Sequence, residues 1–176
     1  WYSLWVDIAY NTGIMTGTGE NLFEPDREVT VAEALQMAAN MDSRYLGDDF
    51  HTTTHRSEPW YGEAVNYCLA SGILSEGQFE DYGRQIPRRE LAQVFASTEL
   101  ARSLRSRNSL VRVIAAVRDV KPGEPGADAV YGLYSKGILT GVDEELSFRP
   151  DSAVTRAEAA ALAARLARPE QRVDLF

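Results

Sequence analysis

The stretch that decides the fold is Phe148-Arg149-Pro150-Asp151, followed closely by Thr155-Arg156-Ala157-Glu158. An earlier stretch repeats it as Phe23-Glu24-Pro25-Asp26 and Thr30-Val31-Ala32-Glu33, with the same ten residues from phenylalanine to glutamate. Threonine three residues before glutamate forms a capping box, in which each side chain accepts a hydrogen bond from the backbone amide of the other. The pattern therefore predicts a loop followed by a helix that the threonine caps.

A Gly-Ile pair precedes each of these loops, at Gly13-Ile14 and Gly137-Ile138, and a third pair stands between them at Gly72-Ile73. Twelve residues before the first two glycines stands a tryptophan, Trp1 or Trp60, and the third copy has none at that place. Apolar residues at helical spacing precede the pairs, so we expect a helix that ends when the glycine takes a left-handed conformation.

The chain therefore contains three repeats of one helix-loop-helix unit, at residues 1–50, 51–108 and 109–176. The middle copy is eroded: its loop is shortened after Phe79, and Pro87-Arg88-Arg89-Glu90 cannot form the capping box. One such unit cannot bury its apolar face alone. We predict an all-α fold, with three helix pairs around a shared core in one compact unit.

Taken together, these motifs resemble the S-layer homology family, as three tandem degenerate repeats from residue 1 to about residue 168. Val117-Arg118-Asp119-Val120 is similar to the opening of a family repeat. The resemblance implies a three-pronged spindle with pseudo-threefold symmetry that binds secondary cell-wall polysaccharide linked to peptidoglycan. It implies a non-catalytic anchoring module without a cofactor, at the cell wall outside a bacterium and fused to another surface domain.

Arginine is the residue type that suits an acidic polymer of this kind. Arg156 is expected at the first position of its helix, beside free backbone amides and the positive end of the helix dipole, and its planar fork matches a carboxylate such as a pyruvate ketal. Arg88 stands at the same place in the middle copy, whereas the first copy has Val31. We expect one or two working grooves, and Arg156 could alternatively serve only to decorate a helix end.

The remaining ligand candidates are Trp60, Trp1, Asp119 and Thr155. A tryptophan could stack on a sugar face, and because family grooves lie between repeats, Trp60 or Asp119 could serve an arginine of another copy. The competing interpretations favour core positions for the tryptophans and a helix or turn cap for Asp119.

Composition excludes several other functions. The net charge of −8 at pH 7 argues against nucleic acid, whose non-specific binding depends on neutralised phosphates. No apolar run of about 18 residues appears, so we expect no membrane insertion. The single cysteine, Cys68, is expected to be a buried apolar residue. Because the chain opens abruptly at Trp1, we expect a piece of a longer protein.

Some features are expected to have no binding or catalytic role. His51 and His55 stand in a threonine-rich linker, where we expect no metal site, and the acidic segment 141–145 is expected to be a turn. The one basic cluster is expected to be solvated, with contact to an anionic polymer as the alternative; it comprises Arg102, Arg105, Arg107 and Arg112. Two histidines and no nucleophile motif argue against catalysis. Two other functions stay open: a structural or protein-interaction domain that has lost the polymer, and attachment to a surface enzyme.

Overall fold

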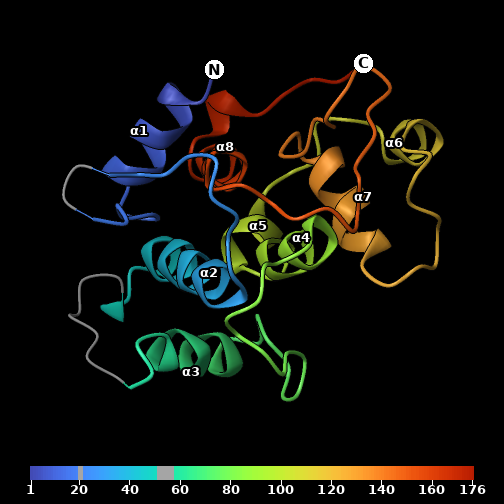
Figure 1. The fold of residues 1–176 in the computed structure, drawn as a ribbon. Coiled ribbons are helices and arrows are strands. Elements are labelled where there is room, and N and C mark those ends of the chain that lie inside the picture. The colour runs from blue at the N-terminus through green and yellow to red at the C-terminus, as the bar shows by residue number, and fades with distance from the viewer. Residues whose placement is uncertain (20–21, 51–57) are drawn as a thin grey trace.

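Helices make up all the regular structure in the part of the chain that the computed structural model describes, residues 1–19, 22–50 and 58–176. They are α1 (Ser3–Asn11), α2 (Val31–Leu46), α3 (Gly62–Ala70), α4 (Arg88–Ala96), α5 (Glu99–Ser103), α6 (Leu110–Ala116), α7 (Ala127–Ser135) and α8 (Arg156–Ala167), followed by the 3-10 helix η2 (Pro169–Gln171). The all-α prediction is confirmed, and Figure 1 shows the arrangement. No helix among the described residues is long and apolar enough to cross a membrane.

The first helix of each helix-loop-helix unit, defined as the helix that precedes the Gly-Ile pair, is α1, α3 or α7, and each has nine residues; α6 lies before the unit in the third repeat. Each is followed by its predicted glycine in the left-handed region, with φ of 67° at Gly13, 70° at Gly72 and 73° at Gly137. The turn lets the next isoleucine amide reach back to the helix, as when Ile14 donates to the carbonyl of Ala9 at 3.0 Å. The predicted helix ends are therefore confirmed.

The second helix of each repeat is α2, α4 or α8. Complete capping boxes begin α2 at Thr30 and α8 at Thr155, as predicted. Pro87 provides no side-chain cap for α4, which ends at Ala96, and α5 begins after Thr98. The missing threonine of the middle repeat thus changes how that helix starts.

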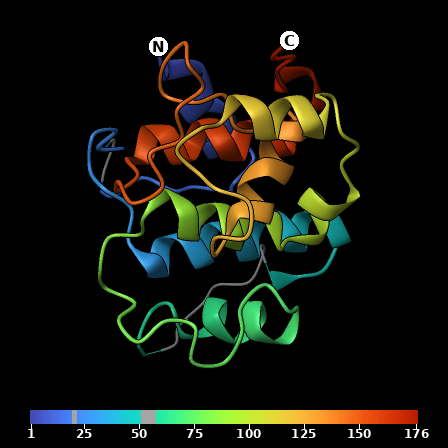
Figure 2. The same ribbon diagram turned by 90° about the vertical axis from the view of Figure 1, so that its right-hand side faces the viewer.

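The helix pairs of this fold form between repeats. The first helix of each repeat packs on the second helix of the repeat before it in a closed cycle: α3 on α2, α7 on α4, and α1 on α8. Figure 1 shows α2 against α3 and α1 beside α8, and Figure 2 shows the same layers after rotation. The expected shared core is therefore built from pairs that no single repeat contains.

Three short segments join the repeats at the centre. In each repeat the first amide of the second helix donates to a backbone carbonyl of a neighbouring repeat. The three bonds are Val31 to Arg84 at 3.0 Å, Arg88 to Ser152 at 2.9 Å, and Arg156 to Arg27 at 2.8 Å. Matching β-bridges join Thr30 to Gln85, Pro87 to Ala153 and Glu28 to Thr155. These bonds follow one direction around the centre, so the repeats are related by a pseudo-threefold arrangement.

The hydrophobic core takes in the loop phenylalanines and the cysteine. Phe79 and Phe148 are buried, and Phe23 packs partly buried against the same core. Cys68 is also buried, and burial raises the pKa of its thiol to about 12. The prediction of an inert, buried cysteine is confirmed.

Candidate ligand-binding grooves

The structure has cavities at equivalent places in the three repeats, each floored by the Gly-Ile loop and second helix of one repeat. Groove 1, of about 870 Å³, lies over the loop at Gly13 and over α2. Groove 2, of about 490 Å³, lies over the loop at Gly72 and over α4. Groove 3, of about 450 Å³, lies over Leu139–Val142 and α8. The pseudo-threefold arrangement therefore produces three versions of one concave surface.

Each of grooves 1 and 3 receives side chains from all three repeats. Groove 1 belongs to the first repeat, but Arg156 of the third and Trp60 of the second complete its lining. Groove 3 belongs to the third repeat, and Arg88 of the second and Trp1 of the first complete it. The prediction that Trp60 meets an arginine from another copy agrees with this placement.

Trp1 and Trp60 are not core residues, which corrects the core position favoured for them above. Trp1 is 78% exposed and Trp60 is 53% exposed. Each lies edge-on to the tyrosine that follows it, with ring centroids 5.7 Å apart for Trp1 and Tyr2 and 5.6 Å apart for Trp60 and Tyr61. The more buried tyrosine takes the inward position just before the helix, which leaves the tryptophan at the edge of a groove.

Arg156 is a buried link between the third and first repeats, with only 5% of its surface exposed. Its Nε donates to the carbonyl of Phe23 at 2.7 Å, and one terminal nitrogen donates to the carbonyl of Thr16 at 2.6 Å. The other lies 3.5 Å from the carboxylate of Glu33, and the guanidinium stacks 4.5 Å from the Phe23 ring centroid. The alternative that Arg156 merely decorates a helix end is therefore wrong.

The amides at the start of α8 are not free, contrary to the prediction. Arg156 and Ala157 donate theirs to the carbonyls of Arg27 and Pro25, and Glu158 donates to the Thr155 hydroxyl. These partners come from the central segments that join the repeats. The start of this helix therefore cannot bind an anion through its backbone, and any anion must be bound by side chains.

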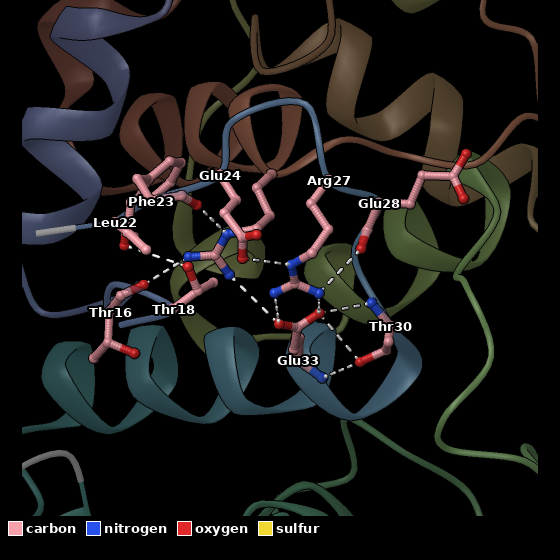
Figure 3. Close-up of polar contacts among 10 residues, drawn as sticks. Thr16, Thr18, Leu22, Phe23, Glu24, Arg27, Glu28, Thr30 and Glu33 are labelled. Carbon is pink, nitrogen blue, oxygen red and sulfur yellow. Dashed lines mark hydrogen bonds and ion pairs between the residues drawn. The ribbon is translucent and has the colours of Figure 1, made fainter. Parts of the chain in front are cut away.

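Glu33 is the carboxylate at the centre of groove 1. Figure 3 shows Arg27 and Thr30 around Glu33 at the start of α2, where both terminal nitrogens of Arg27 donate to Glu33. Burial raises the pKa of Glu33, but hydrogen bonds from Arg27 and the Thr30 amide outweigh it, so the pKa lies below its ordinary value. Groove 1 thus contains two arginines that share the ionised Glu33, and a second carboxylate, Glu24, lies 3.4 Å from Arg27.

Arg88 repeats the role of Arg156 one repeat further on. Its Nε donates to the Phe148 carbonyl at 2.6 Å, its NH1 donates to Glu158 at 3.0 Å, and its guanidinium lies 5.3 Å from the Phe148 ring centroid. Thr155 lines the same groove and caps α8. Groove 3 thus contains an arginine already paired with the capping-box glutamate.

Groove 2 departs from the other two. Val31 stands where they have an interrepeat arginine, and it is fully buried. Glu90 is instead paired only within the second repeat, by Arg84 at 2.6 Å among the described ion pairs, and Arg84 lies 5.5 Å from the Phe79 ring centroid. The groove lining itself carries three carboxylates and no arginine, from Glu90, Glu124 and Asp128.

Arg27 and Arg84 were missed by the sequence reasoning. Each stands six residues before the glutamate that ends the four-residue helix-start motif of its own repeat, Glu33 or Glu90, and each pairs with it. Ser152 stands at that offset in the third repeat. The signal that could have identified both arginines is this shared six-residue offset from the glutamate.

Asp119 caps a turn, as the competing interpretation expected, but the turn lies 29 residues further along the chain. Its carboxylate accepts hydrogen bonds from the amides of Phe148, at 2.9 and 3.0 Å, and Arg149, at 2.7 Å. Arg149 has a left-handed φ of 58°, and these bonds stabilise the strained turn at Phe148-Arg149. Asp119 is not among the residues that line the three grooves.

The remaining candidates are the two histidines, the acidic segment 141–145 and the basic cluster; Gly141 and Val142 of the acidic segment line groove 3. His51 and His55 fall outside the described residues, and in the rest of the chain no cluster of three or more ligating side chains could hold a metal. Asp143 accepts from the Ser147 amide at 2.9 Å, as expected for a turn. In the basic cluster, Arg107 donates to the Arg172 carbonyl and Arg112 stacks on Phe176, so two of its members hold the C-terminal segment.

Comparison with known families adds one finding. The model of the S-layer homology domain matches residues 1–35 and 118–160. These segments carry the two complete copies of the motif, and the eroded middle repeat lies between them. No curated protein matches the chain.

Proposed function

Since the chain is an S-layer homology protein, and such domains are non-catalytic modules that anchor proteins at the cell surface, we propose that it binds secondary cell-wall polysaccharide linked to peptidoglycan. The polymer lies in grooves 1 and 3. In this way the chain tethers an attached surface domain to the wall outside a bacterium.

The observation that carries the proposal is the meeting of an exposed tryptophan and a buried arginine in one groove. Trp60 presents an aromatic face beside Arg156, and Trp1 does so in the groove of Arg88. An aromatic face suits the apolar side of a sugar ring, and a guanidinium suits an acidic substituent such as a pyruvate ketal. The lining of groove 2 has neither a tryptophan nor an arginine, so groove 2 takes no part in binding the polymer.

The other predicted residues support binding from a distance. Thr155 shapes groove 3 by capping α8, while Asp119 holds the loop that carries Phe148, on which Arg88 stacks. We propose that both position the binding groups, and that contact with the sugar falls to the tryptophans and arginines.

The test is co-sedimentation with purified cell-wall sacculi, with and without the acid-extractable secondary polymer. Trp60→Ala and Trp1→Ala probe the two grooves, and because both side chains are largely exposed, the variants should fold normally. Tyr45→Ala is the matched control, since Tyr45 is 48% exposed on α2 and lines neither groove. Binding that disappears on extraction and weakens in a tryptophan variant, but not in the control, supports anchoring.

A second candidate is a structural or protein-interaction domain that keeps the fold and has lost the polymer. It is favoured by the bonds that the two arginines already make within the protein. Arg156 bonds two backbone carbonyls and Glu33, and Arg88 bonds one carbonyl and Glu158. Under this alternative the wild-type chain does not sediment with sacculi, although it is fully folded.

A further inference from the structure

Groove 2 lacks an arginine that the other two grooves contain. In grooves 1 and 3 the first residue of a neighbouring repeat's second helix, Arg156 or Arg88, places its guanidinium over the loop phenylalanine and against the helix-start glutamate. In groove 2 the equivalent residue is Val31, which is fully buried and has no polar group in its side chain. One of three equivalent guanidinium positions is therefore left without the arginine of a neighbouring repeat.

The groups that bind the guanidinium in the other grooves are still present in groove 2, but they have fewer partners. Both interrepeat arginines donate through Nε to the carbonyl of the loop phenylalanine, whereas no described residue donates to the carbonyl of Phe79. Glu90 accepts one described hydrogen bond, from Arg84 to Oε2, and its Oε1 accepts none from the described residues. Pro87 has neither the amide hydrogen nor the hydroxyl with which the capping threonines bond their glutamates. Phe79 and Glu90, which both line the cavity, therefore lack donors that their counterparts have.

Arg84 does not replace the missing interrepeat arginine. It pairs with Glu90 from within its own repeat, as Arg27 pairs with Glu33. In groove 1 the glutamate pairs with an arginine of that kind and also with Arg156 of a neighbouring repeat. A glutamate at this place can therefore pair with two guanidinium groups, and Glu90 pairs with one.

The charge of the groove favours a cation. Its described lining carries the carboxylates of Glu90, Glu124 and Asp128 and no arginine or lysine. Arg84 pairs with Glu90 at 2.6 Å, and Arg89 lies 3.7 Å from Glu124, so both of these carboxylates have a counter-ion nearby. Asp128 is exposed in the first turn of α7, and no described cation lies within ion-pairing distance of it. Its charge is therefore one that a bound cation can neutralise.

We propose that groove 2 binds the guanidinium of an arginine presented by another protein chain, at the position that Arg156 and Arg88 take in the other grooves. The planar fork of a guanidinium can donate to a carboxylate and to a neighbouring carbonyl together, and an ammonium group lacks this geometry. Such a ligand supplies the donors that Glu90 and the Phe79 carbonyl lack. This inference does not rest on polymer binding, in which groove 2 takes no part.

The chain itself presents arginines of this kind on its surface. Residues 100–118 contain five arginines and no acidic residue, in a chain whose net charge is −8. Arg105 and Arg118 are exposed, and neither has an ion pair among the described residues. A second copy is therefore one source of the guanidinium, because its basic stretch complements the acidic groove. The groove and the stretch are different surfaces, so such a contact would add copies head to tail.

The direct test is an NMR titration of the whole chain with N-acetyl-L-arginine amide, followed through the backbone amide resonances of Ser75, Gln93 and Asp128, which line the groove. N-acetyl-L-citrulline amide, which has a similar shape without the charge, and sodium chloride at equal ionic strength are the controls. We expect the arginine derivative to shift these resonances in a saturable way, while the controls do not. Resonances that do not move, or that the citrulline derivative moves equally, overturn the proposal.

Two variants test the position of the ligand. Val31→Arg restores the arginine of the other grooves, so it should fill the site and abolish binding of the arginine derivative. Asp128→Asn should fold normally and weaken binding about two- to fivefold, as expected for an exposed ion pair. Glu99→Gln is the matched control, because it removes the same charge from the first turn of α5, outside the groove.

Either of two results refutes the site. One is equal weakening in the Asp128 and Glu99 variants, which would show that only net charge matters. The other is undiminished binding by a Val31→Arg variant that circular dichroism shows to be folded. If Val31→Arg does not fold, the comparison of Asp128→Asn with Glu99→Gln decides alone.

Sedimentation velocity then identifies the source of the guanidinium. If the source is a second copy, association grows with protein concentration, N-acetyl-L-arginine amide reverses it, and Val31→Arg abolishes it. A chain that binds the derivative but stays monomeric assigns the guanidinium to another protein and keeps the site. The anchoring role fails separately: a chain that ignores sacculi but binds the arginine derivative retains this site, and one that sediments with sacculi without binding the derivative lacks it.

Discussion

Replacing Arg156 with alanine should destabilise the whole fold as well as alter a groove. The side chain is 5% exposed and bonds two backbone carbonyls of the first repeat, at 2.7 Å to Phe23 and 2.6 Å to Thr16. Each such bond from a charged donor contributes about 1.5–3 kcal/mol. Because the variant leaves buried acceptors without their donor, we expect the free energy of unfolding to fall by about 3–5 kcal/mol.

Arg27→Ala provides the comparison, because Arg27 contacts the same Glu33 from a position where its side chain is 36% exposed. Exposed ion pairs contribute only about 0–1 kcal/mol. Urea unfolding followed by far-UV circular dichroism at pH 7 measures both variants. If Arg156→Ala loses no more stability than Arg27→Ala, then Arg156 is not the structural link described above. If the prediction holds, lost polymer binding in Arg156→Ala cannot be attributed to the groove without a folding control.

Four further predictions follow from particular residues. Because the folded-state pKa of Glu33 is lowered, its contribution to stability is complete above the unfolded-state value near 4.5 and is lost as pH falls through the folded pKa; urea midpoints measured from pH 7 to 3 should fall less steeply in Glu33→Gln. The Cys68 thiol, with its pKa raised to about 12 by burial, should react with an aromatic disulfide reagent only after unfolding, and rapid reaction in the native state would contradict its burial. Gly137→Ala should cost more than Gly72→Ala in thermal unfolding: both have positive φ, which costs an L-residue about 1–2 kcal/mol, but only at Gly137 would the new Cβ meet backbone, that of Val173. A chain ending after residue 108 lacks α8, on which α1 packs, so it should show no cooperative melting transition, and a sharp one would mean that the first two repeats fold alone.

The starts of two helices and the ends of three others could be predicted from the sequence, because local chemistry determines them. Thr30 and Thr155 cap their helices three residues before a glutamate, and Gly13, Gly72 and Gly137 end theirs through a positive φ that glycine adopts without strain. The burial of Cys68 likewise followed from its own residue type. Each of these features depends on neighbours within a few residues along the chain.

The grooves were predicted only in part. That Arg156 and Arg88 stand at helix starts followed from the motif, but their carbonyl partners lie 133 and 60 residues away along the chain. The exposure of Trp1 and Trp60 depends equally on packing. No spacing within one repeat encodes such contacts.

The sequence by itself determined that this protein is a threefold helical repeat with capped second helices and glycine-terminated first helices. Only the tertiary structure decided which repeat supplies each wall of a groove, because every first helix buries its apolar face on the repeat before it. In this packing, the first amide of each second helix donates to a carbonyl of a neighbouring repeat. The same packing places Trp60 in one groove with Arg156, and Trp1 in another with Arg88. A repeat can be recognised from its own residues, but a groove that three repeats share is determined by how they pack.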